Sequence, residues 1–591
     1  MGWLALAVGL VASRAVRAPS AGLDPGWITG INVAAGNNVP FGRSLLFTYG
    51  PWGFLDNPLT VSRGHVLLGV IFSAAAVAMV FHAVHSGVRP HLNRTAAGAL
   101  AAVVAVTLWS PGVASYLLLS ACAALSVRYL RGEMAHERWF LPAIAAVAAL
   151  LIQIKFSEGL ALVVIATGTA LFSRPTVRSF MVAVGTYVAA FVVTWSAVGQ
   201  SRHDLWPWLT GSVQIASGYV EAMAIEAEPN LLSYPLAAAC FILLALLAVG
   251  SARALPMRPG VGVVVVVVVS ALFAFKQGFT RHDVHELAYF SLIAVLMTAL
   301  LPRGALPTFV WPALGLSVLL AASAWSNLDP ISARDDWKRV AQTMLSESYQ
   351  QQELITAAAQ ARQTYALSPS VIDVARGRPM TVDPWEVTLA WAYSFNWRPA
   401  PILQTYSAYT ANLDERNARA VTTASSDQVV IRSAEPSAID GRNPIWESPR
   451  YTLALACRYQ PAAGDARWVA LTKADNRCTV PTRVSRQRLP ANEPVTLPKV
   501  QPGTIVLASF DPDKPSPATR LLGLLLKPYR QLIATTDGSP HRLPVGLADG
   551  PLIVALPGGT GLTAAGDSGI AYSRLSFNEP GRLTLQTLDR R

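Results

Sequence analysis

Long apolar runs recur along the first 325 residues of the chain, separated by short polar connections. Several approach the roughly 17 to 25 residues that an α-helix needs to cross a bilayer. They predict eleven spans, near residues 3–17, 65–86, 95–110, 112–130, 139–154, 158–173, 179–198, 232–250, 260–275, 286–301 and 308–325. No small-residue cleavage site follows the first run, so it is interpreted as a retained span and not a signal peptide.

After residue 325 the pattern becomes that of a soluble region. A helical segment, "DDWKRVAQTMLSESYQQQELITAAAQARQTYAL", precedes shorter alternating segments such as "RPMTVDPWEVTLAWAYSF". Strand-like runs then recur between Pro, Gly and Asp turns: "YTLALACRYQ", "ARWVALTKA", "TIVLASF", "PLIVALP" and "GRLTLQTL". Such spacing is typical of a β-sandwich. The sequence therefore predicts a polytopic α-helical membrane domain over 1–325, a mixed α/β segment over 326–440 and a β-rich, sandwich-like domain over 441–591.

Composition agrees with a lipid bilayer as partner and argues against nucleic acid. The chain is 52% hydrophobic and only 14% charged, whereas soluble proteins carry about a quarter charged residues. Its net charge of +12 comes mostly from basic residues that stand singly in short loops or at the ends of apolar runs. Because no basic helix carries interleaved aromatic residues, nucleic acid is not an expected partner.

The basic residues also orient the chain, because cytoplasmic loops are enriched in Lys and Arg. With a cytoplasmic N-terminus, each inner loop carries at least one arginine: Arg89 and Arg94; Arg128, Arg131 and Arg138; Arg174 and Arg178; Arg253 and Arg258; Arg303. Everything after residue 325 then lies outside a bacterial cytoplasmic (inner) membrane. Cys457 and Cys478 belong to that outer region and are expected to form a disulfide.

Two outer connections carry cations that run against this bias. Lys155 stands at the outer end of one apolar run, and "KQGFTRHDVHE" separates two others. The candidate residues of the second connection are Lys276, Arg281, His282 and Asp283. Charges at membrane depth are costly and usually paired or functional, so these residues are either snorkelling anchors or a shared site for an anion such as a lipid phosphate. His282, Asp283 and His285 also resemble metal ligands, but no other His or Cys stands nearby in sequence, so we expect no metal or other cofactor.

The first outer segment, "AGLDPGWITGINVAAGNNVPFGRSLLFTYGPWGFLDNP", is long, aromatic and rich in glycine. Asp24 followed by Pro25 predicts a helix N-cap with proline at the first helical position, opening a short helix through Ala35. Its aromatic faces suit a sugar ring, with an interfacial aromatic belt as the alternative. The candidate substrate-binding residues here are Arg43, Tyr49 and Trp52. In the outer region, "NWRPAPILQTYSAYTANLD" is expected either to pack in a core or to bind an acceptor glycan.

An acidic residue just after the first span, followed by membrane-lying helices, resembles the GT-C superfamily of polytopic glycosyltransferases. The strings "GLDPGW", "GRSLLFTYGPWGFL", "KQGFTRHDVH" and "PAPILQTYSAYT" are similar to those of an uncharacterised group of bacterial membrane proteins. The GT-C resemblance implies transfer of a sugar from a polyprenyl-phosphate donor to a cell-envelope glycan or glycolipid. Asp24 would be the catalytic base, and a second group would act on the phosphate or the acceptor: Lys155, Lys276, Arg281, His282 and Asp283. The WWD-type motif of oligosaccharyltransferases is absent, so transfer of a preassembled glycan to asparagine is not expected.

Two other functions fit a polytopic chain of this kind. A lipid-linked-glycan transporter or flippase predicts charges in mid-span and broken helices in two related halves, and the chain has no convincing half-repeat. A non-catalytic envelope assembly protein would carry the outer β-domain without requiring Asp24 to meet the cations. Convergence of those side chains around one site therefore distinguishes the enzyme from this last alternative.

Overall fold

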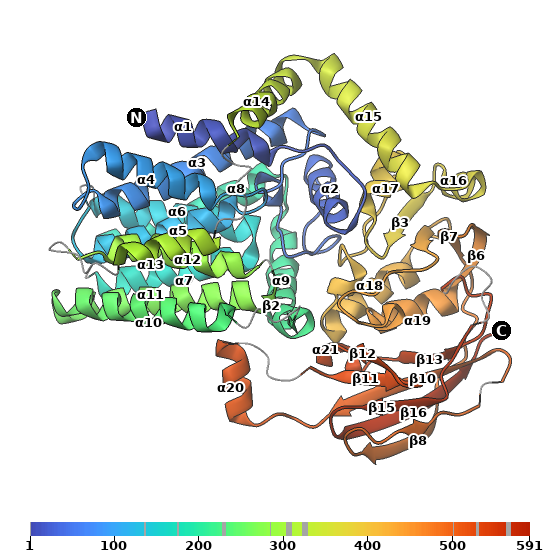
Figure 1. Cartoon of the computed structure of the whole chain (residues 1–591). Helices are drawn as coiled ribbons and strands as arrows, with labels where there is room; N and C mark the ends of the chain where they lie inside the picture. The colour runs from blue at the N-terminus through green and yellow to red at the C-terminus, as the bar shows by residue number, and fades with distance from the viewer. Residues whose placement is uncertain are drawn as a thin grey trace.

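The computed structural model describes residues 2–134, 137–173, 176–226, 232–283, 285–302, 310–321, 329–499, 501–526, 531–562 and 569–591. Within these ranges a helical bundle, built by the first part of the chain, adjoins a C-terminal region that contains three sheets (Figure 1).

Each apolar range predicted from the sequence overlaps a helix of the bundle. Their bounds are α1 (Gly2–Val11), α3 (Arg63–Val88), α4 (Arg94–Thr107), α5 (Ala114–Leu130), α6 (Glu137–Ile154), α7 (Phe156–Phe172), α8 (Val177–Ala197), α10 (Ser233–Arg253), α11 (Met257–Phe279), α12 (Glu286–Leu300) and α13 (Val310–Ala321). Among the described residues, four of these helices are long and apolar enough to cross a membrane, namely α3, α8, α10 and α11. These four helices indicate a membrane protein, whereas the count of eleven spans stays a prediction. The end of the last predicted range, beyond residue 321, lies outside the described residues.

Helix α8 exposes the kind of apolar surface that indicates a surrounding bilayer. Its buried residues are Ala183 and Trp195, whereas Val177 is 80% exposed, Met181 60% and Val193 65%. Soluble monomers rarely leave such continuous apolar surface in contact with water. Lipid acyl chains would cover these apolar side chains and remove them from contact with water.

Two further helices and a small parallel sheet lie at one end of the bundle, the right-hand end in Figure 1: α2 (Leu23–Gly36), α9 (Arg202–Met223), β1 (Ile225–Glu226) and β2 (Arg281–His282). The helix predicted after the first span is therefore present, but Asp24 is not its N-cap. Gly22 occupies the cap with φ +126°, and Asp24 lies in the first turn. Glycine adopts this backbone conformation without a side-chain clash, which lets the helix begin earlier than the Asp-Pro pair indicates.

The sequence did not predict α9, which lies in the connection between α8 and α10. Ser201 caps the helix by accepting a hydrogen bond from the His203 amide, and Asp204 bonds back to the Ser201 amide in a capping box. Gly42 of the first outer segment lies against the start of this helix, because an added Cβ there would be 2.5 Å from the Asp204 carbonyl oxygen. Helix α9 is thus fixed to the first outer segment.

The C-terminal region begins with helices α14 (Pro330–Leu345) and α15 (Glu347–Tyr365), which confirms the predicted helical segment. A mixed five-stranded sheet follows, in the order β4-β3-β5-β7-β6. Its elements are α16 (Pro369–Ala375), β3 (Pro379–Asp383), α17 (Val387–Ala392), β4 (Asn396–Trp397), α18 (Ala411–Thr423), β5 (Val429–Ser433), α19 (Pro449–Arg458), β6 (Tyr459–Gly464) and β7 (Trp468–Lys473). The sheet takes strands from both sides of residue 440, the boundary expected from the sequence.

Two antiparallel sheets complete the chain, in the orders β14-β13-β10-β16-β8 and β12-β11-β15-β9. Their elements are β8 (Thr482–Leu489), β9 (Val495–Thr496), β10 (Thr504–Pro512), α20 (Pro517–Leu525), β11 (Ile533–Thr536), β12 (Ser539–Arg542), α21 (Val545–Ala548), β13 (Leu552–Leu556), β14 (Ile570–Ala571), β15 (Arg574–Phe577) and β16 (Gly581–Asp589). Phe510 of one sheet stacks on Phe577 of the other with ring centroids 3.8 Å apart, so the two sheets share a core.

Four of the five quoted runs form the predicted strands, namely β7, β10, β13 and β16. The fifth, "YTLALACRYQ", is mostly helix α19, so the strand prediction there was wrong. Pro449 occupies the first turn of that helix, and Tyr451, Thr452, Leu455 and Ala456 bury one helical face. A proline at a helix start and apolar residues four apart favour a helix over a strand.

The bundle and the C-terminal region meet through the first outer segment. The Leu46 amide donates to the Pro401 carbonyl oxygen at 2.6 Å, and the Leu403 amide donates to the Leu46 carbonyl oxygen at 3.1 Å. A Cβ added to Gly26 of α2 would lie 2.5 Å from the Trp385 carbonyl oxygen. The two backbones therefore approach too closely at this junction for a side chain at residue 26.

Candidate functional site

An aromatic stack in the first outer segment brings together three of the residues predicted from sequence. The rings of Trp27 and Tyr49 stack with centroids 4.7 Å apart, and Phe47 lies 5.4 Å from Trp27. The Trp27 indole donates a hydrogen bond to Asp24 Oδ1 at 3.0 Å. Lys155 Nζ lies 5.4 Å from the centroid of the Tyr49 ring, in cation–π geometry. Asp24, Tyr49 and Lys155 thus surround one stack, which we call the aromatic platform.

The carboxylate of Asp24 is exposed at the edge of this platform. It lies in the first turn of α2, where the unpaired amides of a helix favour negative charge. The indole hydrogen bond fixes its direction. An accessible carboxylate held beside aromatic faces can accept a proton from a sugar hydroxyl.

Lys155 is held in place by its backbone and by its ammonium group. It forms an isolated antiparallel bridge with Tyr49 and occupies the N-cap position of α7. Its Nζ lies 2.6 Å from Glu158 Oε1, and the Glu158 side chain is fully buried. The lysine therefore neutralises a buried carboxylate while its charge stays over the aromatic ring.

Asp56 is a buried carboxylate near Lys155 that was not predicted from the sequence. It accepts hydrogen bonds from the Ser115 amide, at 2.8 Å, and from the Ser115 hydroxyl. The pKa of Asp56 is raised to about 7, mainly by burial and also by charge repulsion from Glu158, while the Ser115 hydrogen bonds and Lys155 act in the opposite direction. The signal was an acidic residue directly after the apolar residues Phe54 and Leu55, since charges at membrane depth are usually paired.

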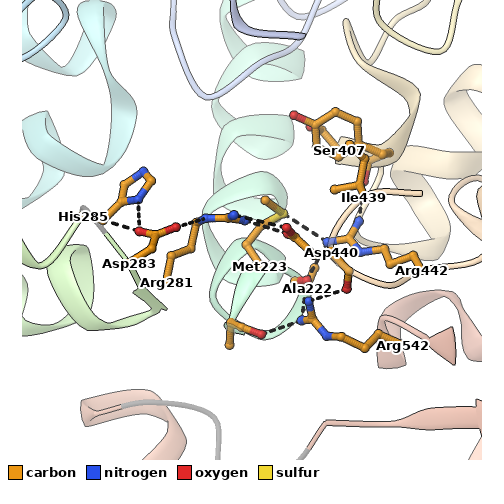
Figure 2. A network of polar contacts seen from close by, with 12 residues as sticks. Ala222, Met223, Arg281, Asp283, His285, Ser407, Ile439, Asp440, Arg442 and Arg542 are labelled. Atoms are coloured by element: carbon orange, nitrogen blue, oxygen red, sulfur yellow. Dashed lines mark hydrogen bonds and ion pairs between the residues drawn. The ribbon is translucent and has the colours of Figure 1, made fainter. Parts of the chain in front are cut away.

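A second cluster joins the loop after α11 to the C-terminal region (Figure 2). The Arg281 guanidinium binds both carboxylate oxygens of Asp440, at 2.6 and 3.1 Å, and its Nε lies 3.4 Å from Asp283. Asp283 accepts a hydrogen bond from the His285 amide at 3.0 Å. Burial opposes ionisation of Asp283, but the hydrogen bonds from His285 and the charge of Arg281 hold its pKa at about 2. Arg281 thus sits between two carboxylates as a paired cation.

Two further arginines bind the end of α9 in the same cluster. Arg442 donates to the carbonyl oxygen of Ala222 at 2.5 Å and to that of Tyr406 at 3.1 Å. Arg542 donates to the carbonyl oxygens of Ala222 and Ala224 and to the backbone oxygen of Asp440 (Figure 2). Cations at a helix C-terminus satisfy its last carbonyls and complement its dipole. Helix α9 is therefore clamped to the C-terminal region.

Tyr219 of α9 connects the aromatic platform with this second cluster. Burial raises the pKa of its phenol, and the charges of Arg281 and Lys155 both act against that rise. Its ring also meets Tyr409 edge-on, with centroids 6.0 Å apart. The structure thus brings Asp24, Lys155 and Arg281 to one end of the bundle, from three segments distant in sequence.

The remaining residues of "KQGFTRHDVHE" face different surroundings. Lys276 is half-buried in the last turn of α11. His282 is 3% exposed; its ring lies 4.5 Å from the Tyr234 ring, and its Nε2 is 3.5 Å from Glu286 Oε2. Among the residues that the structure describes, no group of three or more His, Cys, Asp or Glu side chains is arranged to hold a metal ion.

Two candidate residues of the first outer segment make contacts that hold it to neighbouring helices. The Arg43 guanidinium forms an ion pair with Asp204 at the start of α9. The Trp52 indole donates to the Thr194 carbonyl oxygen of α8 at 2.9 Å. Arg43 remains 57% exposed, so it stays accessible to a ligand, whereas Trp52 is committed to α8.

The aromatic run "NWRPAPILQTYSAYTANLD" packs onto the first outer segment. Gln404, Tyr406 and Tyr409 are all buried. Gln404 donates to the Leu23 carbonyl oxygen at 3.1 Å and accepts from the Tyr406 hydroxyl at 2.7 Å. Core packing is therefore confirmed for these three side chains. Cys457 and Cys478 are joined in a disulfide in the same C-terminal region.

No protein-family model, curated protein or solved structure matches this chain.

Proposed function

We propose that the protein is a membrane glycosyltransferase that moves a sugar from a polyprenyl-phosphate donor to a cell-envelope glycan or glycolipid at the outer face. The observation that supports this most is the aromatic platform, where an exposed carboxylate and a lysine flank stacked Trp27 and Tyr49 rings. Aromatic faces bind the apolar faces of sugar rings. The reaction needs a group that accepts the proton of the acceptor hydroxyl and a cation that stabilises the departing phosphate. The platform holds a carboxylate for the first role and a lysine for the second.

In the proposed reaction Asp24 accepts the proton of an acceptor hydroxyl. The hydroxyl oxygen forms a bond to the anomeric carbon of the donor sugar, and the bond from that carbon to the lipid-phosphate oxygen breaks. The electron pair leaves with the phosphate, whose developing charge Lys155 stabilises. Loss of a positioned base costs about a hundredfold or more in rate.

The ion pairs define what the donor phosphate would meet. Lys155 already forms an ion pair with Glu158, and Arg281 with Asp440. A bound phosphate would therefore either share these two cations with the carboxylates or displace the carboxylates from them. In this proposal Lys155 and Arg281 bind the donor phosphate from two sides, and Lys276 adds positive charge from the end of α11.

A second candidate function, a non-catalytic envelope assembly protein, is favoured by the same ion pairs. Arg43, Lys155 and Arg281 each neutralise a carboxylate of the protein itself, which suits a structural junction between bundle and outer region. Donor binding distinguishes the two functions, because a structural junction does not require a prenyl phosphate.

Native mass spectrometry of the protein in nanodiscs tests the proposal, with polyprenyl-phosphate sugars as probes. We expect a bound prenyl phosphate in the wild type and a several-fold weaker signal in Lys155→Ala. Arg419→Ala is the matched control, since Arg419 is 70% exposed and pairs with Glu415 on a helix surface. No binding by the wild type, or equal binding by Lys155→Ala, would contradict the proposal and leave the assembly function.

A further inference from the structure

Helix α20 is an apolar extension of the outer β-sheets that its own domain does not cover. It lies in the connection between β10 and β11, with Pro517 in its first turn and the Ser516 hydroxyl capping it by accepting from the Thr519 amide at 3.2 Å. Leu521 is 56% exposed and Leu522 51% exposed, and Leu526 just after the helix is 42% exposed. Three exposed leucines on so short a segment are unfavourable in water.

The exposed apolar residues form one face of the helix. Ala518, Leu521 and Leu522 follow the i, i+3, i+4 spacing that places side chains on one stripe. Thr519 and Arg520 fall on the other side. An amphipathic helix with leucines on one face and a basic residue on the other is typical of segments that lie in the plane of a membrane interface.

The position of α20 relative to the bundle points to the same surface. Figure 1 shows α20 apart from the sheets, below the right-hand end of α10 and running across the direction of the bundle helices. A helix perpendicular to membrane-crossing helices, at the level of their ends, lies parallel to the bilayer plane. Helix α10, which lies above α20 in this view, itself exposes Ile242 (59%) and Leu246 (65%), so apolar side chains also face outward on the bundle.

We propose that α20 inserts its leucine face into the bilayer at the interface of the leaflet nearest the C-terminal region. The occupant of this face is lipid: acyl chains cover Leu521 and Leu522, while Arg520 meets anionic headgroups. The helix then fixes the outer β-sheets against the membrane, beside the end of the bundle that carries the aromatic platform. This inference requires only a membrane-embedded bundle and does not depend on glycosyl transfer.

Spin labelling in nanodiscs of phosphatidylethanolamine and phosphatidylglycerol tests the inference. Labels are attached at Leu521→Cys and, separately, Leu522→Cys, and collision rates are measured with oxygen, which partitions into lipid, and with a water-soluble nickel chelate. The native free thiols, Cys122 and Cys240, are buried, and unmutated protein provides the blank. Arg520→Cys is the control on the opposite helix face, and Val484→Cys, 51% exposed on β8, is the control on the outer sheet.

We expect the ratio of oxygen to nickel collisions at residues 521 and 522 to exceed several-fold that at residues 520 and 484. An intact Cys457–Cys478 disulfide in each variant verifies that the outer region is folded. A water-like ratio at both leucines would overturn the inference. Labels screened from both reagents would also overturn it, because they would indicate a protein partner or a second copy covering this face.

Discussion

The bidentate pair between Arg281 and Asp440 predicts a strong coupling between the bundle and the C-terminal region. The two hydrogen bonds measure 2.6 and 3.1 Å, and the side chains are only 18% and 13% exposed. Hydrogen bonds to charged groups contribute about 1.5–3 kcal/mol each, and breaking a fully buried pair costs about 3–5 kcal/mol. For this partly buried pair we expect a coupling energy of about 1.5–3 kcal/mol. The value should fall in the lower part of that range, because Asp283 remains a second partner of Arg281.

A double-mutant cycle with Arg281→Gln and Asp440→Asn measures this coupling. The free energies of unfolding of the wild type, the two single variants and the double variant are compared in detergent micelles. We expect each single change to cost nearly as much as the double change, because both remove the same contact. The matched control is the pair Arg376 and Asp373, 73% and 65% exposed at 3.1 Å. Exposed pairs typically couple by about 0.2–1 kcal/mol.

Additive costs at Arg281 and Asp440 would contradict the predicted coupling between the two side chains. A coupling no larger than that of the surface control would do the same. Either result would mean that the junction between the bundle and the C-terminal region does not depend on this contact.

Two further predictions concern stability. Cys457→Ser is expected to lower the free energy of unfolding of the C-terminal region by about 3 kcal/mol, since the disulfide closes a loop over a sequence separation of 21. An unchanged stability would contradict this prediction, as would two freely alkylated thiols in the unreduced wild type. Burial is the main cause that raises the pKa of Asp56 above its unfolded value, to about 7. The Asp56 carboxyl group therefore contributes stability that is fully present below about pH 4 and is lost as the pH rises through 7. Thermal unfolding of Asp56→Asn between pH 5 and 8 should therefore depend less on pH than that of the wild type, and an identical pH profile would argue against a buried, protonated Asp56.

Much of the fold follows from local sequence pattern. The apolar runs predict the bundle helices, and the helical segment before residue 367 forms α14 and α15. Helix α9 was missed although its start carries a recognisable signal, Ser201 followed three residues later by Asp204 in a capping box. Helix α19 was mistaken for a strand because a short apolar run fits both periodicities.

The partners of the candidate residues were not predictable in the same way. Arg281 and Asp440 are 159 residues apart in sequence, and no local pattern indicates that they meet. Glu158 lies within three residues of Lys155, so this pair was within reach of a local argument. The aromatic platform depends on the close approach of the first outer segment to the start of α7, which only the tertiary fold establishes.

The most direct test of the proposed catalysis is glycosyl transfer by Asp24→Asn. Because Gly22 and not Asp24 occupies the helix cap, the substitution leaves the start of α2 intact. The amide oxygen of Asn can still accept the Trp27 hydrogen bond, but the amide cannot take a proton from an acceptor hydroxyl. We predict that purified Asp24→Asn protein folds and binds a polyprenyl-phosphate sugar normally, and that its transfer rate falls about a hundredfold or more. A transfer rate near that of the wild type would contradict the assignment of Asp24 as the base.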